Sequence, residues 1–293
     1  MKKFISALTT LLCCLCFAAT ALANEVEIIN VHTVQELVSA MKPDTVINLA
    51  PGTYNITEAS DISTRYISWE NTFDGPQLNL NGIKNLTIMG GTSAGDYHLV
   101  VSPSYADVIQ FFNCDNIRIT GVKMGHLKTG GCVGSVLHFI TSKGIELSNC
   151  DLYGCGVIGL ELESVNNIKV SRSYIHDCSS ELLFMENCNQ VVFDHTTFKA
   201  GKESGWTPTI VINGPATDVS FTDSIFCGYE SMSIFYGQKT MLYNFNIQNC
   251  CTRLLDKQNN VVAEEQFSFQ AAPNGSPNGL FGYDYAQNYC ANN

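Results

Sequence analysis

The segment NIKVSRSYIHDCSSELLFMENCNQVVF, residues 167–193, contains the spacing that decides the fold. A short apolar stretch that begins at Ile168 returns as a similar stretch at Val191, 23 residues later. Each such stretch follows a polar turn, and we call its first apolar residue the anchor. The other anchors are Leu86, Ile117, Ile145 and Val219, and the successive intervals are 31, 28, 23, 23 and 28 residues. This spacing is typical of a repeat protein with insertions in some turns.

Within each repeat, apolar and polar residues alternate with a period of two, which predicts strands rather than helices. Bulky apolar residues recur eight and six positions before each anchor: Ile109/Phe111, Leu137/Phe139, Leu160/Leu162 and Leu183/Met185. They recur seven positions after it: Met124, Leu152, Ile175, Phe198 and Phe226. Columns of like residues indicate that each repeat stacks on the previous one and hides its apolar face there.

This pattern resembles the generic secreted β-helix repeat proteins of the pectate-lyase-like superfamily. The resemblance covers most of the chain after residue 23, and residues 31–57, VHTVQELVSAMKPDTVINLAPGTYNIT, are similar to the family's N-terminal module. It implies an all-β fold: a single-stranded right-handed parallel β-helix with 23-residue rungs and an N-terminal helical cap. We expect the N-terminal cap at 24–60, the rungs at 78–251 and an irregular C-terminal cap at 252–293.

Residues 1–23 have the form of a cleavable secretory signal, with two lysines, an apolar run and the small residues Ala21 and Ala23. We therefore expect a secreted or periplasmic protein that begins near Asn24. No later segment is long and apolar enough to cross a bilayer.

Without that signal, 14 basic side chains face 27 acidic ones, and the formal net charge is −13. This charge argues against nucleic acid or an anionic membrane as a partner, because both favour lysine and arginine. It also disfavours a strongly anionic glycan unless cations bridge the two molecules.

Ten cysteines remain after residue 23, and an exported protein permits disulfides. Cys155 and Cys178 lie one 23-residue period apart, which would bring their Cα atoms to roughly 5 Å in stacked rungs. A disulfide between rungs and two stacked thiols are equally compatible with this spacing. Cys150 belongs to another column and is expected to be a small buried side chain.

The outward positions of the first strand in each repeat form a candidate site. Three carboxylates spanning two rungs share one flat face, with a histidine one rung away and aromatic residues nearby. The candidate catalytic residues are Glu161, Glu163, Glu186 and His138, and the candidate binding residues are Trp206, Phe184, Phe112 and Gln110. One interpretation is a carbohydrate groove whose carboxylates act as an acid–base pair or as calcium ligands. The other is a solvated strand face on an acidic protein.

Enzyme motifs of the resembling families are mostly absent. VVFDHTTF, residues 191–198, is similar to the Asp-His segment of pectate lyases, but the chain has no Arg-x-Pro-x-x-Arg motif and no clustered aspartates. We therefore expect structural roles for Asp194 and His195.

The sequence thus predicts a monomeric, exported protein that presents an acidic, partly aromatic face to a polysaccharide or cell-surface glycan at the cell envelope or outside the cell. No cofactor is required, and calcium is the metal that the three glutamates could hold. A polysaccharide lyase or glycosidase acting in the same groove is the first alternative. A structural surface protein or adhesin is the second.

Overall fold

The structure, a computed structural model, describes residues 25–92, 96–128, 133–154, 157–202, 209–229, 234–237 and 242–270. The predicted signal segment, the residues from 271 onward, Cys155 and Trp206 lie outside the described residues. The proposed Cys155–Cys178 bridge therefore stays a prediction. Within the described part of the chain, no helix has the length and apolarity needed to cross a membrane.

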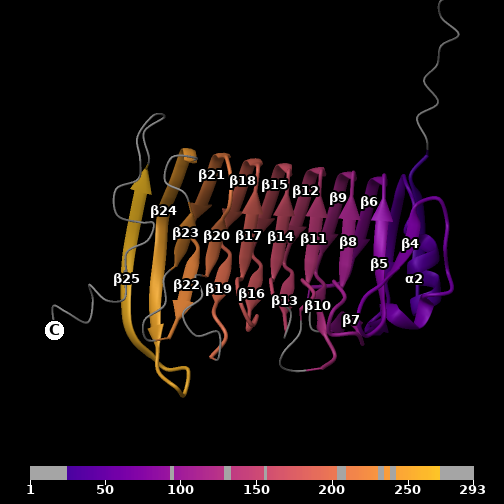
Figure 1. Ribbon diagram of the computed structural model, residues 1–293, viewed down its shortest axis with the longest axis horizontal. Helices are drawn as coiled ribbons and strands as arrows, with labels where there is room; N and C mark the ends of the chain where they lie inside the picture. The colour runs from indigo at the N-terminus through magenta and orange to yellow at the C-terminus, as the bar shows by residue number, and fades with distance from the viewer. Residues whose placement is uncertain are drawn as a thin grey trace, which may run out of the picture.

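The chain forms a parallel β-solenoid in which strands of successive repeats lie side by side in three stacks (Figure 1). The first stack contains β4 (Ile67–Asn71), β5 (Pro76–Asn81), β8 (Ile109–Phe112), β11 (Leu137–Ile140), β14 (Leu160–Glu163), β17 (Leu183–Glu186), β20 (Ile210–Ile212) and β23 (Phe235–Gly237). The second contains β1 (Glu27–Val31), β2 (Thr45–Leu49), β6 (Lys84–Met89), β9 (Asp115–Thr120), β12 (Lys143–Ser148), β15 (Asn166–Ser171), β18 (Cys188–Asp194), β21 (Ala216–Thr222) and β24 (Leu242–Leu255). The third contains β3 (Gly52–Asn55), β7 (Tyr97–Val101), β10 (Lys123–His126), β13 (Asp151–Tyr153), β16 (Tyr174–His176), β19 (Thr197–Lys199) and β22 (Ile225–Gly228), and β24 continues beyond β22.

The predicted apolar columns point inward and are buried. Ile109, Leu137, Leu160 and Leu183 are successive backbone partners and have no exposed surface. Phe111 and Phe139 stack with ring centroids 4.6 Å apart. Repetition therefore builds the core, because each rung covers the apolar face of the one before it.

The predicted register was wrong in one rung. Phe184 and Ile212 each lie seven residues before an anchor, Val191 and Val219, so the repeat predicts that both point outward from neighbouring rungs. The backbone partner of Phe184 is instead Val211, and Ile212 is buried opposite Met185. Met185 and Cys188 are three positions apart, whereas their partners Ile212 and Ala216 are four apart. One additional residue in this turn shifts the alternation.

Asparagines lie in the turns along the solenoid, and Asn85, Asn116 and Asn167 all have positive φ angles between 56° and 61°. The Asn116 amide donates to Asn85 Oδ1 over 2.8 Å, and the Asn85 amide donates to Asp44 Oδ1 over 2.7 Å. Asparagine suits these positions because it tolerates the left-handed conformation and its amide can both donate and accept.

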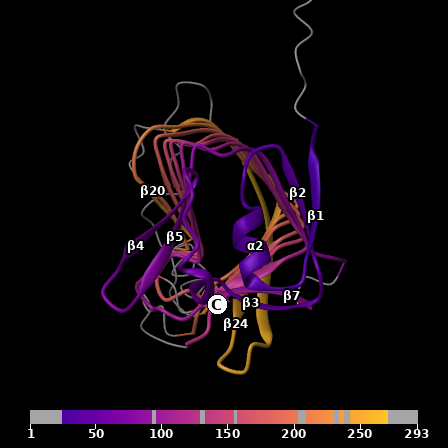
Figure 2. The same ribbon diagram turned by 90° about the vertical axis from the view of Figure 1, so that its right-hand side faces the viewer.

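Helix α2 (Val34–Ala40) lies at the N-terminal end of the solenoid, beside the short 3-10 helix η1 (Ile56–Ala59) (Figure 2). Thr33 and Glu36 form a reciprocal capping box at its start, and Leu37 and Val38 are fully buried in the core. That this helix protects the open end of the stack stays a prediction. At the other end, β25 (Val261–Gln270) pairs antiparallel with β24.

Cys150 is buried, as predicted. Its amide donates to Ser173 Oγ over 3.1 Å, and that hydroxyl donates to the Ser171 carbonyl over 2.9 Å. The corner between the second and third stacks is thus filled by small side chains that satisfy backbone groups.

Candidate functional site

The outer face of the first stack carries the predicted site residues that the structure describes. One outward column follows the backbone pairing through Asn79, Gln110, His138, Glu161, Phe184, Val211 and Tyr236. The second follows Asn81, Phe112, Ile140, Glu163 and Glu186. We call these two columns the first-stack face. Neither column contains lysine or arginine.

His138 lies among three carboxylates on this face. Its Nδ1 is 3.1 Å from Asp107 Oδ2 and 3.8 Å from Glu161 Oε2, and its Nε2 is 3.4 Å from Glu163 Oε1. Nε2 is buried and has no hydrogen-bond partner, since the contact with Glu163 lacks hydrogen-bond geometry. The side chains of His138, Asp107 and Glu161 are at most 17% exposed, whereas that of Glu163 is 39% exposed. Glu163 is therefore the member most accessible to a ligand.

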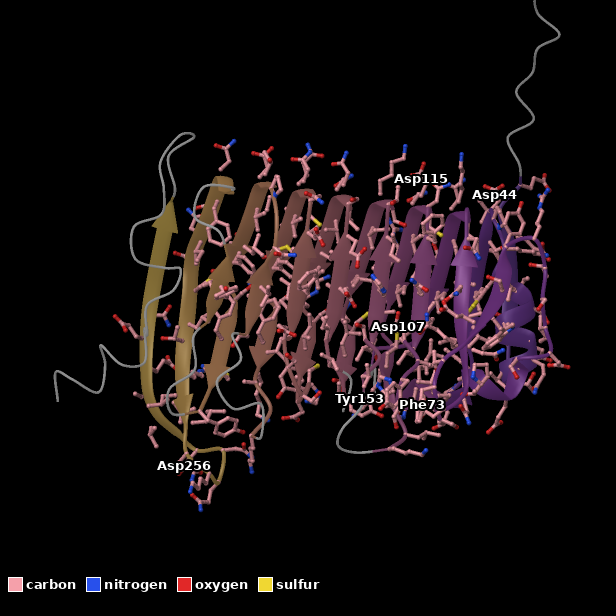
Figure 3. All side chains as sticks on the ribbon, viewed as in Figure 1. Asp44, Phe73, Asp107, Asp115, Tyr153 and Asp256 are labelled. Atoms are coloured by element: carbon pink, nitrogen blue, oxygen red, sulfur yellow. The ribbon has the colours of Figure 1, made fainter. Side chains whose placement is uncertain are left out.

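Sequence reasoning missed Asp107, whose position on the solenoid is labelled in Figure 3 and whose Oδ2 contacts His138 Nδ1. Asp107 Oδ1 accepts the Ser135 amide over 2.7 Å, and the Asp107 amide donates to Gln77 Oε1 over 2.8 Å. The Ser135 hydroxyl also donates to Glu161 Oε2. Asp107 and Ser135 precede their strands, in segments where the repeat length varies. Column counting therefore gave no signal for them.

The carboxylates alter the protonation of this cluster. Burial alone would lower the pKa of His138, but the hydrogen bond with Asp107 and the charges of Glu161, Asp107 and Glu163 raise it above its usual value. Burial raises the pKa of Glu161, and this effect exceeds the opposing influence of His138 and Ser135. Three carboxylates around one imidazole thus leave negative charge that the cluster does not neutralise internally.

Calcium fits this donor set poorly. The group whose ligand atoms all lie within 4.8 Å of one another is His138, Glu161 and Glu163, and it includes an imidazole nitrogen. Calcium prefers six to eight oxygen ligands. Glu186, the third predicted calcium ligand, is the backbone partner of Glu163 but is not in this group.

Exposed aromatic side chains lie along the same face and at its edge. Phe112 is 47% exposed and Tyr236 is 60% exposed. Phe73, in the turn between β4 and β5, is 86% exposed (Figure 3). Its ring centroid lies 5.0 Å from that of Tyr105. Asp74 holds this pair in place by accepting the amides of Ser104 and Tyr105.

A second polar network, which the sequence did not reveal, covers the outer side of the third stack. The Tyr153 hydroxyl lies 2.7 Å from His98 Nε2, and the Lys123 ammonium lies 4.5 Å from the centroid of the Tyr153 ring. Gly125 makes room for this ring, because a Cβ there would lie 2.6 Å from it. Burial and Lys123 lower the pKa of His98, and burial and Asp151 raise that of Tyr153. A neutral imidazole and a neutral phenol thus share one hydrogen bond.

His176 connects the remaining members of this network. Its two ring nitrogens lie 2.8 Å from Asp151 and 2.7 Å from Asp177, and its ring stacks on Tyr174 with centroids 3.9 Å apart. Lys199 lies 3.0 Å from Asp177. Each charge here faces an opposite charge, in contrast to the His138 cluster.

His195 occupies a turn position with a φ of 49° and contacts Asp194 over 2.7 Å. Its side chain is 60% exposed, and the carboxylates of Asp194 and Asp223 lie close enough to share one metal ion with it.

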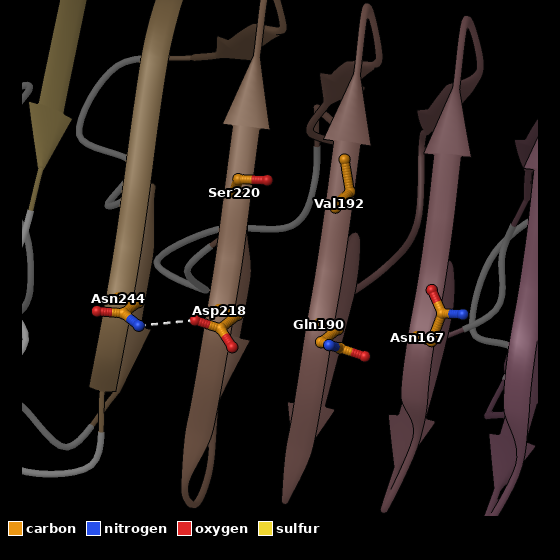
Figure 4. Close-up of a pocket in the computed structure, with 6 residues that line it drawn as sticks. All are labelled: Asn167, Gln190, Val192, Asp218, Ser220 and Asn244. Carbon is orange, nitrogen blue, oxygen red and sulfur yellow. Dashed lines mark hydrogen bonds between the residues drawn. The ribbon is translucent and has the colours of Figure 1, made fainter.

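A separate shallow pocket lies over the second stack, lined by Asn167, Gln190, Val192, Asp218, Ser220 and Asn244 (Figure 4). The Asn244 amide donates to Asp218 there, so these residues continue the turn ladder.

No protein-family model and no curated protein sequence matches the chain. Among solved structures, it is similar to an alginate lyase from Paenibacillus sp. str. FPU-7, with a TM-score of 0.54 and 13% identity over 84% of this chain and 89% of that one. The chain is a parallel β-helix. A pectate lyase from Paenibacillus sp. 0602 has a TM-score of 0.47 and 9% identity over 84% of this chain and 80% of that one. A surface adhesin of Streptococcus pneumoniae has a TM-score of 0.36 and 9% identity over 87% and 89%.

Proposed function

We propose that this β-helix protein is exported and binds a polysaccharide along the first-stack face. The observation that carries the proposal is that the two outward columns bring amides, carboxylates and the exposed rings of Phe112 and Tyr236 onto one face. Aromatic rings provide flat apolar surface for sugar rings, and carboxylates and amides accept or donate hydrogen bonds to hydroxyl groups. The fold shared with an alginate lyase supports a carbohydrate ligand.

A panel of neutral and uronate oligosaccharides, tested with purified protein, checks this proposal. We expect at least one glycan to bind, and we expect Phe112→Ala and Tyr236→Ala to weaken its binding by about fivefold each, because each removes an aromatic contact of roughly 1 kcal/mol. Ile28→Ala is the control, because Ile28 is 67% exposed on β1 of the second stack. Absence of binding across the panel, or equal losses in the control, would contradict the proposal.

A polysaccharide lyase is the second candidate, and the Tyr153–His98 contact favours it. A phenol within hydrogen-bond distance of an imidazole can transfer a proton to or from a bound sugar. The nearby Lys123 ammonium could attract a uronate carboxylate. Catalysis at Glu161, Glu163 and Glu186 stays a prediction.

Ultraviolet absorbance of an unsaturated product tests the lyase. We expect Tyr153→Phe to abolish it and Tyr66→Phe to retain it, because the Tyr66 hydroxyl contacts only Arg65 among the described hydrogen bonds. Loss with Glu161→Gln instead would place the chemistry on the first-stack face. No product with any uronate polymer would exclude this second candidate.

A further inference from the structure

The first-stack face contains one buried nitrogen atom that its neighbours leave unsatisfied. His138 Nε2 has no hydrogen-bond partner, and the carboxylate oxygen Glu163 Oε1 lies 3.4 Å from it. An unpaired polar atom in a buried position costs free energy unless a ligand or a proton satisfies it. A group bound between His138 and Glu163 would satisfy Nε2.

The other side of the ring fixes which nitrogen is available. Asp107 Oδ2 lies 3.1 Å from Nδ1, and Asp107 is itself held by the Ser135 amide. An Nδ1–H that donates to Asp107 leaves the lone pair on Nε2, and this atom lies 3.4 Å from Glu163 Oε1. A carboxylate behind a histidine in this way is the usual arrangement that orients a metal-binding imidazole.

We propose that His138 Nε2, Glu161 and Glu163 bind a divalent cation of the zinc class, and that Asp107 is the positioning residue for His138. This site lies in the face proposed to bind polysaccharide, but it does not require a bound glycan. The cation neutralises the carboxylates that surround His138 and that the cluster leaves uncompensated.

The donor atoms select zinc over calcium. One imidazole and two carboxylates are ligands that Zn²⁺ accepts in four-coordinate sites, with the fourth position open to water or a sugar oxygen. Ligand bonds of about 2.1 Å in a tetrahedral site place neighbouring donor atoms about 3.4 Å apart. The observed separation of Nε2 and Glu163 Oε1 is 3.4 Å, and His138, Glu161 and Glu163 each offer a ligand atom within 4.8 Å of those of the other two.

Other donors in the described residues are weaker competitors. Asp194, His195 and Asp223 also lie within reach of one ion, but His195 is 60% exposed and its Nδ1 already contacts Asp194. Burial raises the pKa of the Cys114 and Cys188 thiols to about 11 and that of Cys150 to about 12. These thiols remain protonated at neutral pH, whereas metal binding needs thiolates.

The test uses the full purified chain, stripped with a chelator and carrying His195→Asn to remove the exposed histidine. Calorimetric titration with Zn²⁺ alone is expected to show one site, accompanied by a higher melting temperature. We expect Glu163→Gln to abolish this site and Asp107→Asn to weaken it by about 10- to 100-fold. Glu186→Gln is the matched control and retains binding, because Glu186 is outside the donor group. Co²⁺ substitution is expected to give visible bands without thiolate charge transfer.

Tighter binding of Ca²⁺ than of Zn²⁺ would overturn the inference, as would unchanged Zn²⁺ binding in Glu163→Gln or a thiolate band with Co²⁺. Absence of any Zn²⁺ site in the wild-type chain would also overturn it. The metal and the glycan are measured separately. Zinc binding without glycan binding would sustain the metal site and refute the proposed function, and the reverse result would refute the metal site alone.

Discussion

Asn116 shows how a single side chain holds adjacent rungs in register. Its φ angle of 56° is left-handed, and its amide donates to Asn85 in the previous rung. A residue with a Cβ but no amide meets a conformational cost there, because the left-handed region is unfavourable by roughly 1–2 kcal/mol for most L-residues.

We therefore predict that Asn116→Ala lowers the free energy of unfolding by about 1–3 kcal/mol, the sum of backbone strain and a lost hydrogen bond. Asn116→Gly is the matched control, since glycine relieves the strain but not the lost bond. Urea unfolding followed by circular dichroism measures both. Equal stability of the wild-type and alanine proteins would show that the ladder contributes nothing.

At the residue scale, the limits of sequence reasoning are visible around His138. Column counting correctly aligned His138 with Glu161 and Glu163 with Glu186, because strand pairing repeats with the sequence period. It could not find Asp107 or Ser135, because these residues depend on how irregular connecting segments fold back on the stack. The sequence therefore predicted the concentration of charged side chains on this face, but not the hydrogen bonds that connect them.

Charged side chains of the third stack pair both with neighbours in the sequence and with residues on adjacent rungs. His176 contacts Asp177 and Asp151, and Lys199 contacts Asp177. Hydrogen bonds from His176 and Lys199 outweigh the effect of burial and lower the pKa of Asp177 to about 2. The same kind of contact lowers the pKa of Asp151. A carboxyl whose folded pKa is depressed stabilises the protein above its unfolded pKa near 3.8 and loses that contribution as the pH falls through its folded value.

We predict that Asp177→Asn destabilises the protein at pH 6, and that the difference from the wild type shrinks steadily between pH 4 and pH 2, where wild-type Asp177 becomes protonated. Urea unfolding of both proteins across this range measures the difference. Because Asp177 is 46% exposed, we expect a modest effect. Asp115→Asn is the control, since its Lys143 partner is 64% exposed. A difference that is constant with pH would contradict the assigned role of Asp177.

At the scale of strands, the repeat predicted most pairings but missed one. The extra residue before β21 moved Val211, rather than Ile212, onto the first-stack face. Such a shift is invisible in the sequence, because a turn can absorb one residue without changing the apolar pattern on either side. It matters here because Val211 and Tyr236 continue the outward column that we propose as the glycan path.

Across the whole molecule, the solenoid separates two kinds of surface. The third-stack side pairs its charges internally, whereas the first-stack side combines unneutralised carboxylates, an unsatisfied imidazole nitrogen and exposed rings. Figure 2 shows that these stacks form different sides of the solenoid. A ligand that supplies cations, hydroxyl groups or sugar rings is therefore better matched to the first-stack face.

Hydroxyl-radical footprinting with mass spectrometry, in the presence of the best-binding oligosaccharide, tests this central claim most directly. We predict protection of Phe112, Phe184 and Tyr236, which lie on β8, β17 and β23 of the first-stack face. We predict no change at Ile28 on β1 or at Val262 on β25, both of which are well exposed. Protection at Ile28, Val262 or Tyr153 with none at Phe112 and Tyr236 would contradict the account.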